Sequence, residues 1–355
     1  MQEDFHYYAT FCAAYIAGYT PEESERIAFS ANFVDLCSKT YLEKVNGPVA
    51  AATTQLSMEM ADMRTDIPGL QEITGIWASF HFLPYDLYAD IKKGFRRYKN
   101  KRRMVCGPNG DLVVDTVRLA KGKSLEHIGL SMHVLADTWA HRYFAGTPSL
   151  VINNTTEPFY ELLESGERRQ IRFIHSLGKA DDLEQGIFAH SPYQAGENSI
   201  MNLGHGRAGH LPDYSFLRYA YLPAWGDYEE IIKDNPSDYL HAFCQMIMAL
   251  KFLNGACPDF EKEQYDFEAI EQHKEEIEMI LKKRQLIACD DWKAFGEKLS
   301  GYTIAPFDME RYSGKEEPFL FRFCTAAMEQ KHMVAKKIYE SGNSLAGKIV
   351  ERSNT

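Results

Sequence analysis

The chain has 355 residues, 45% of them hydrophobic and 25% charged, a composition typical of a globular protein that can bury a substantial core. Its formal net charge of −11 argues against general nucleic-acid binding, and its seven scattered cysteines form no Cys-x-x-Cys pair and so argue against a disulfide scaffold. No run reaches the roughly 18 apolar residues of a membrane span and no leader peptide is visible, so we expect a cytoplasmic protein without a transmembrane segment.

Helices dominate the predicted elements. Thr20, Pro21 and Glu23 combine a capping box with a proline at the first helical position, and they open a helix expected over 21–45. Pro-Asn-Gly-Asp, between two short β-prone runs at 104–114, predicts a small hairpin. The other predicted helices cover 4–17, 124–145, 157–173, 227–254, 265–286, 290–299 and 317–341, whereas 70–83 carries an aromatic run that ends before Pro84, and 175–226 is expected to be mostly loop.

These elements predict an all-α, multi-helix bundle with a small β-hairpin excursion and a long irregular loop. Residues 1–226 are expected to form a metal-binding helical core, and the helices of 227–355 to pack on the same domain. Within the first of these regions, Lys92–Arg103 holds eight basic residues. A solvated edge is the ordinary interpretation of such a run, and phosphate binding is the alternative.

The most informative stretch is His133-Val-Leu-Ala-Asp137-Thr-Trp-Ala-His141. Residues four apart on an α-helix drift by about 40° and rise by roughly 6 Å, so the two histidines and the aspartate form one stripe. Imidazole nitrogen and carboxylate oxygen are ligands that suit zinc, and the two oxygens of the central Asp137 allow it to bridge two ions. The simpler alternative is a helix whose His and Asp hydrogen-bond neighbouring loops.

Other ligand-type residues occur before and after this helix. The segment Gly204-His-Gly-Arg-Ala-Gly-His-Leu-Pro-Asp213 offers His205, His210 and Asp213 among glycines, which permit the backbone to fold around an ion. Asp35 is expected within a helix, on a face of small residues that leaves room beside it, although a salt-bridged or capping Asp fits equally well. His6 and His81 are embedded in aromatic residues, where a core histidine is the usual interpretation; together with the others they fit a multi-metal site in a helical bundle.

Taken in chain order, the ligand-type residues named above resemble the metal ligands of the zinc-dependent phospholipase C superfamily, which includes the single-strand-specific zinc nucleases. The segment 133–141 is similar to the His-x3-Asp-x3-His helix of the phospholipase-like branch, and the opening Asp4-Phe-His-Tyr-Tyr-Ala-Thr10 and the 204–210 loop look like an uncharacterised bacterial family of that fold. The resemblance implies an all-helical protein with two or three zinc ions. By this resemblance Asp137 would bridge two ions. Asp35, His81 and His133 would bind one ion, His141 and His205 another, and His6 a third. The relatives place a carboxylate one turn after the late histidine, where this chain has Gly209, so His210 or Asp213 is the expected substitute.

Such a site implies a metal-dependent phosphoric-ester hydrolase, phospholipase C-like, in which hydroxide is generated at a multinuclear zinc site. Its substrate is expected to be a small phosphoester or a lipid headgroup. Asp35 or Asp137 would orient the attacking water, and Arg207 or Arg142 would bind phosphate oxygens. The alternative is a non-catalytic, metal-stabilised helical binding protein. A phosphohydrolase of the HD type is disfavoured, because the chain has no adjacent His-Asp pair.

Overall fold

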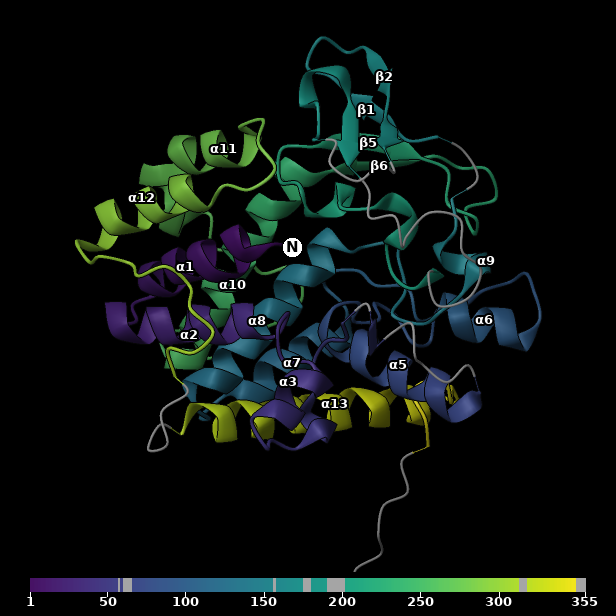
Figure 1. The fold of residues 1–355 in the computed structure, drawn as a ribbon, viewed down its shortest axis with the longest axis horizontal. Helices are drawn as coiled ribbons and strands as arrows, with labels where there is room; N and C mark the ends of the chain where they lie inside the picture. The colour runs from purple at the N-terminus through teal and green to yellow at the C-terminus, as the bar shows by residue number, and fades with distance from the viewer. Residues whose placement is uncertain are drawn as a thin grey trace, which may run out of the picture.

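The computed structural model describes residues 1–56, 58–59, 66–155, 158–174, 180–189, 202–312 and 318–348. It is mostly helical with small sheets (Figure 1). Its α-helices are α1 Thr10–Ile16, α2 Pro21–Phe33, α3 Lys39–Lys44, α5 Ile67–Phe80, α6 Arg96–Arg102, α7 Asp111–Ala120, α8 Leu125–Ala140, α9 Leu150–Asn153, α10 Asn235–Asn254, α11 Lys274–Lys282, α12 Cys289–Ser300 and α13 Phe319–Glu340. A π-helical segment, η1, covers Asp4–Ala9. Short 3-10 helices cover η2 Val49–Ala51, η3 Leu183–Gln185, η6 Gly206–Ala208, η7 Leu211–Asp213 and η8 Glu268–His273.

Helix α8 is the central element, buried from Glu126 to Ala140 and packed against α2, α5, α7, α10 and α13. Its contact with α2 is close, because a Cβ on Gly129 would lie only 2.2 Å from the carbonyl oxygen of Ile27. A buried ion pair fixes the register of the two helices: Arg26 donates to Oε1 of Glu126 from Nε at 2.9 Å and from a terminal nitrogen at 2.6 Å. The helix that carries the histidine stripe is therefore rigidly held.

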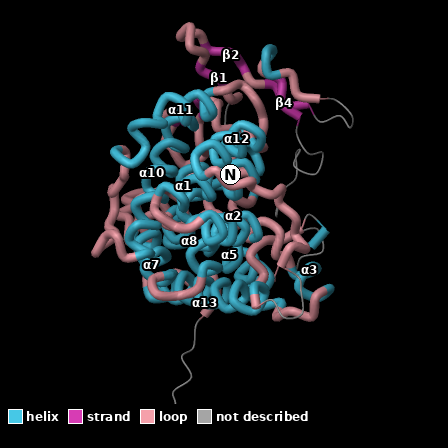
Figure 2. Tube along the Cα trace, turned by 90° about the vertical axis from the view of Figure 1, so that its left-hand side faces the viewer, coloured by secondary structure: helices cyan, strands magenta, loops and turns pink. Residues whose placement is uncertain are grey.

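The strands gather at one end of the molecule, above the helices (Figure 2). β1 Tyr160–Leu162, β2 Arg168–Gln170, β5 Arg218–Tyr221 and β6 Ile231–Asp234 form an antiparallel sheet in the order β2-β1-β5-β6, with Tyr160 opposite Gln170 and Ala220. β3 Arg172–Ile174 and β4 Ile187–Ala189 pair in parallel. A second apolar cluster, including Phe82, Phe144, Phe159 and Tyr221, lies under this end and joins the strands to the helical core.

Several predicted elements are confirmed, and others are wrong. The capping box is present, with Thr20 Oγ1 accepting from the Glu23 N–H and the Glu23 carboxylate accepting from the Thr20 N–H. The predicted hairpin at 104–114 is instead a turn at Asn109 followed by α7, because Leu112, Val113, Val114 and Val117 bury one helical face. The predicted helix at 157–173 is replaced by β1, β2 and the start of β3. The antiparallel partner of β1 is β5, which lies about sixty residues further on in a region predicted to be loop.

Three boundaries also differ from expectation. The predicted helix over 21–45 is interrupted at 34–38, so that Asp35 lies in a turn after α2 rather than within a helix. Helix α8 ends at Ala140 and not near Gly146, since Tyr143 takes a left-handed backbone (φ 81°) and Val105 pairs with Ala145. The predicted helix over 227–254 begins with β6 before α10.

All seven cysteines are free, and five of them are buried, as expected of thiols that serve as core residues. Within the described part of the chain, no helix is both long and apolar enough to cross a membrane. The main hydrophobic core draws on residues from Met1 to Ile338, so the helices after residue 226 share it with the earlier ones.

Candidate metal centre

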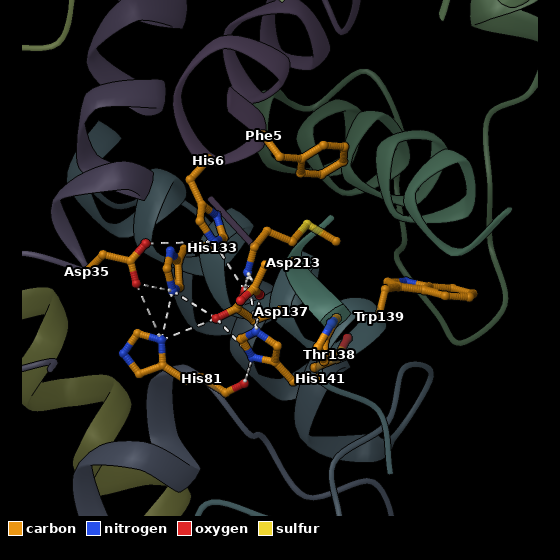
Figure 3. Close-up of polar contacts among 12 residues, drawn as sticks. Phe5, His6, Asp35, His81, His133, Asp137, Thr138, Trp139, His141 and Asp213 are labelled. Carbon is orange, nitrogen blue, oxygen red and sulfur yellow. Dashed lines mark hydrogen bonds and ion pairs between the residues drawn. The ribbon is translucent and has the colours of Figure 1, made fainter. Parts of the chain in front are cut away.

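The two histidines and the aspartate of the predicted stripe lie in and directly after the C-terminal half of α8, where they meet residues from four other segments (Figure 3). His133 and Asp137 are almost completely buried, and His141 is the residue that ends the helix. His6 comes from η1, Asp35 from the turn after α2, and His81 from the residue that ends α5. Loop 202–217 supplies the remaining candidates, His205, His210 and Asp213.

The Asp137 carboxylate is the centre of this cluster. Its Oδ1 lies 3.1 Å from Nε2 of His6, and its Oδ2 lies 3.2 Å from Nδ1 of His81 and 3.2 Å from Nε2 of His133. The two oxygens therefore face different imidazoles, the arrangement expected of a carboxylate shared between two ions. His6, His133 and Asp137 bring three ligand atoms within 4.8 Å of one another.

A second group consists of Asp35, His81 and His133. Oδ1 of Asp35 lies 3.7 Å from Nδ1 of His81 and 3.9 Å from Nε2 of His133. These separations exceed hydrogen-bond lengths, yet the ligand atoms are close enough to converge on one ion. Asp35 is the most exposed member of these first two groups, with 36% of its side chain accessible.

His141, His205 and Asp213 form a third group. Nε2 of His141 lies 3.1 Å from Oδ1 of Asp213, and Nε2 of His205 lies 3.7 Å from Oδ2. His210 contacts Asp213 through Nδ1 at 3.0 Å, but 48% of its side chain is exposed. Two residues are expected to replace the carboxylate that is absent at position 209. Asp213 belongs to the group, whereas His210 contacts Asp213 from the more exposed side.

Backbone carbonyls select the tautomers of three of these histidines. A carbonyl oxygen only accepts hydrogen bonds. The Thr53 carbonyl lies 3.0 Å from Nε2 of His81, the His81 carbonyl 2.8 Å from Nδ1 of His141, and the Gly209 carbonyl 2.7 Å from Nδ1 of His205. The proton of each neutral ring is then on that nitrogen, so the other nitrogen presents a lone pair to Asp35, Asp137 or Asp213. A lone pair and a carboxylate repel unless a cation lies between them. Beside His141 the amino group of Met1, 3.3 Å from Nε2, supplies that positive charge, and a metal ion bound there would replace it. Such outer-shell carbonyls commonly orient metal-binding histidines.

The electrostatics of the buried groups agree with this assignment. Burial lowers the pKa of His205 to about 4, so its ring is neutral at pH 7. Burial, followed by the neighbouring His133, lowers the pKa of His6 to about 4. Burial alone would raise the pKa of Asp137, but His141 and the amino group of Met1 hold it well below its usual value. His6 and His205 are thus neutral imidazoles at neutral pH and Asp137 is ionised, the forms that bind a divalent ion.

His81 is the exception among these histidines. Burial would lower its pKa, but the hydrogen bond to Asp137 and the charge of Asp35 raise it. The same two carboxylates that favour a proton on His81 would favour a divalent cation beside it. Protons and metal ions therefore compete at this residue.

The cluster includes groups that the residue spacing did not indicate. The amino group of Met1 donates to Oδ1 of Asp137 at 2.6 Å and lies 3.3 Å from Nε2 of His141. Carbonyl oxygens of Thr53 and Gly209 are outer-shell acceptors. Because every residue has a carbonyl, no sequence signal distinguishes those that point into a site.

Arg207, predicted to bind phosphate, donates from Nε to Oδ1 of Asn202 at 3.0 Å. Arg142, the other candidate, donates to Oδ1 of Asp238 at 3.0 Å and packs over the ring of Tyr143. Both arginines belong to segments that carry ligands of the third group, and their role toward a phosphate stays a prediction.

No curated protein and no solved structure matches the chain. The model of a family of unknown function (DUF6765) matches residues 1–344, and the chain therefore belongs to that family.

Proposed function

We propose that this protein is a metal-dependent phosphoric-ester hydrolase, phospholipase C-like, with two or three zinc ions held by the His/Asp cluster. The observation that carries the proposal is the set of carbonyl-anchored imidazoles of His81, His141 and His205, whose other ring nitrogens face Asp35, Asp137 and Asp213. Three adjoining groups of nitrogen and oxygen ligands, two of them sharing His133, suit clustered zinc better than a single hard cation such as magnesium. The resemblance of the α8 motif to the zinc-dependent phospholipase C superfamily supports the same choice.

Bound divalent ions would lower the pKa of a coordinated water toward neutrality and offset negative charge on the phosphoester oxygens. The protein residues would contribute position and charge. Asp35, which is partly exposed, is placed to accept a hydrogen bond from an attacking water, whereas buried Asp137 keeps the ligand groups together. The hydrogen bond between His141 and the His81 carbonyl would fix the position of the third group relative to the second.

Metal analysis and phosphodiester hydrolysis, measured on the same preparation, test the proposal. The purified protein is expected to contain two or three zinc equivalents by mass spectrometry and to hydrolyse bis(p-nitrophenyl) phosphate. Chelation should remove both metal and activity, and added zinc should restore them. His133→Ala should abolish activity and reduce the metal content.

The matched control is His127→Ala, since His127 lies on the same helix and is 9% exposed but contacts Ser124 and Glu329 instead of the cluster. This variant should retain metal and activity. A protein purified without metal that binds none when zinc is added would overturn the metal centre. Full metal content with no hydrolysis of phosphodiesters or phosphomonoesters would instead establish the alternative, a metal-stabilised binding protein.

A further inference from the structure

The basic segment Lys92–Arg103 is a positively charged surface on an acidic protein. It contains eight lysines and arginines and no acidic residue, whereas the whole chain has a net charge of −11. Helix α6, which forms its second half, has no buried residue and lies at the periphery of the molecule beside α9 (Figure 1).

Carboxylates neutralise little of this charge. Among the residues that the structure describes, one member of the segment forms an ion pair, Lys93 with Asp227 at 3.0 Å, and both side chains are more than 70% exposed. An exposed pair of this kind contributes little. Lys92, Arg96 and Arg97 are exposed and have no carboxylate partner in the described structure.

Large exposed aromatic side chains accompany the charge. Phe95, at the start of α6, is 89% exposed, and Tyr228 is 90% exposed. The Lys93–Asp227 contact places Tyr228 next to the basic segment. Exposed aromatic side chains beside clustered lysines and arginines are typical of surfaces that bind a bilayer interface.

The loop that carries Tyr228 has a specific conformation. Asp227 (φ 50°) and Tyr228 (φ 68°) are both left-handed, which is uncommon for residues other than glycine. The loop is anchored by Trp225, whose ring lies 3.6 Å below the guanidinium carbon of Arg102. The tyrosine is therefore held beside the basic segment by a backbone that resists rearrangement.

A cavity of about 430 Å³ adjoins this surface. Arg102, Arg103 and Arg142 line it together with Trp225 and Tyr143, and its acidic lining residues are Asp86 and Glu263. Arg142 is paired with Asp238, and Arg102 and Arg103 are the members of the basic segment that reach the lining of this cavity.

We propose that Lys92, Lys93, Phe95, Arg96, Arg97 and Tyr228 form a docking surface for an anionic lipid bilayer. Clustered lysines and arginines attract the headgroups, while Phe95 and Tyr228 insert at the interface. Single-stranded nucleic acid also combines charge with aromatic stacking, but the fully apolar side chain of Phe95 favours the bilayer. The surface is independent of the metal centre, so its failure would leave the hydrolase proposal standing.

Vesicle co-sedimentation of the full-length protein tests the surface. Vesicles of phosphatidylcholine with about one-third phosphatidylglycerol should bind the protein, vesicles of phosphatidylcholine alone should bind it weakly, and high salt should weaken binding. Phe95→Ser/Arg96→Glu should reduce the partition constant about tenfold or more. Chelator treatment should leave it unchanged.

The matched control is Phe321→Ser/Arg322→Glu, the same chemical change on α13, where Phe321 is 77% exposed outside the basic segment. It should bind vesicles as the wild type does. Equal losses in the two variants, equal binding to neutral and anionic vesicles, or binding to a single-stranded oligonucleotide but not to vesicles would each overturn the proposal.

Discussion

The imidazole rings of His6 and His133 stack with their centroids 3.9 Å apart and their planes inclined by 21°. Both side chains are fully buried, and Nε2 of each lies within 3.2 Å of an Asp137 oxygen. Two imidazolium ions at this distance, away from water, would repel strongly. The stacked pair is consequently suited to bind a metal ion as neutral ligands, and it should make the metal-free protein sensitive to acid.

The stability of the chelator-treated protein should fall as the pH decreases from about 7 to about 5. His6 has a pKa near 6.5 when unfolded and about 4 when folded, so the unfolded chain binds more protons in this window and is favoured by acid. The loss due to His6 is roughly 2 kcal/mol, measured as the urea unfolding free energy at each pH. His6→Gln should flatten the pH dependence between 7 and 5; an unchanged slope in this variant would contradict the assignment.

Asp137→Asn and Asp35→Asn should differ in a diagnostic way. Asp137 is buried and accepts a hydrogen bond from the Met1 amino group at 2.6 Å, so losing its charge leaves a buried ammonium group unpaired and should destabilise even the metal-free protein, by about 3 to 5 kcal/mol. Asp35 is partly exposed, and its replacement should leave the unfolding free energy of the metal-free protein nearly unchanged while lowering metal content. Chemical denaturation in chelator, followed by metal analysis, separates the two effects. Equal destabilisation by both variants would argue against Asp137 as the central ligand.

Much of this site could be predicted because its ligands obey a local rule. His133, Asp137 and His141 follow the helical repeat, so that their shared direction is set by the α8 backbone alone. The helix itself is fixed by burial on all sides. Ligands from other segments are different: the contact between Asp35 and His81 depends on how α2 and α5 pack against α8, which no local pattern encodes.

The errors in the predicted fold have the same origin. β1 and β2 are only three residues each, and β1 pairs with β5 across about sixty residues of chain, Tyr160 lying opposite Ala220, so the pattern within 157–173 does not reveal this pairing. At 104–114, the Asn-Gly pair correctly predicts a turn, but the run after it forms a helix instead of a strand. Burial of Val113 and Val117 on one face, four residues apart, decides in favour of α7.

Gly129→Ala should destabilise the protein by about 1 to 3 kcal/mol, because its methyl group would lie 2.2 Å from the Ile27 carbonyl oxygen and push α2 away from α8. Gly75→Ala in α5 is the control. Its methyl would approach no atom closer than 3.9 Å, and alanine favours a helix over glycine by up to about 1 kcal/mol. Thermal unfolding should therefore shift down for the first variant and stay level or rise for the second. Tolerance of alanine at 129 would show that the helices are further apart than described.

Gly204→Ala should remove one metal equivalent, the one assigned to His141, His205 and Asp213. A Cβ at position 204 would lie 2.1 Å from the ring of Phe82, which stacks on His141 at 4.8 Å and lies 5.7 Å from His205. Either the ring or the loop must move, so the imidazoles of this group should no longer point at one ion position, while His6, His81 and His133 stay in place. The measurement is metal content by mass spectrometry after dialysis against a fixed free-zinc buffer.

Left-handed strain alone could also disturb the loop, since Gly204 has φ +54°. Gly166→Ala isolates that effect, because Gly166 has φ +84° but no described atom lies within 4 Å of the position that its new methyl group would take. It should show a similar small loss of stability, about 1 kcal/mol, and keep all its metal. If both variants retain the same number of zinc equivalents as the wild type, loop 202–217 is not part of a metal site. If Gly204→Ala loses every equivalent, the three ligand groups bind as one cooperative cluster, as the contact of His141 with the His81 carbonyl would then explain.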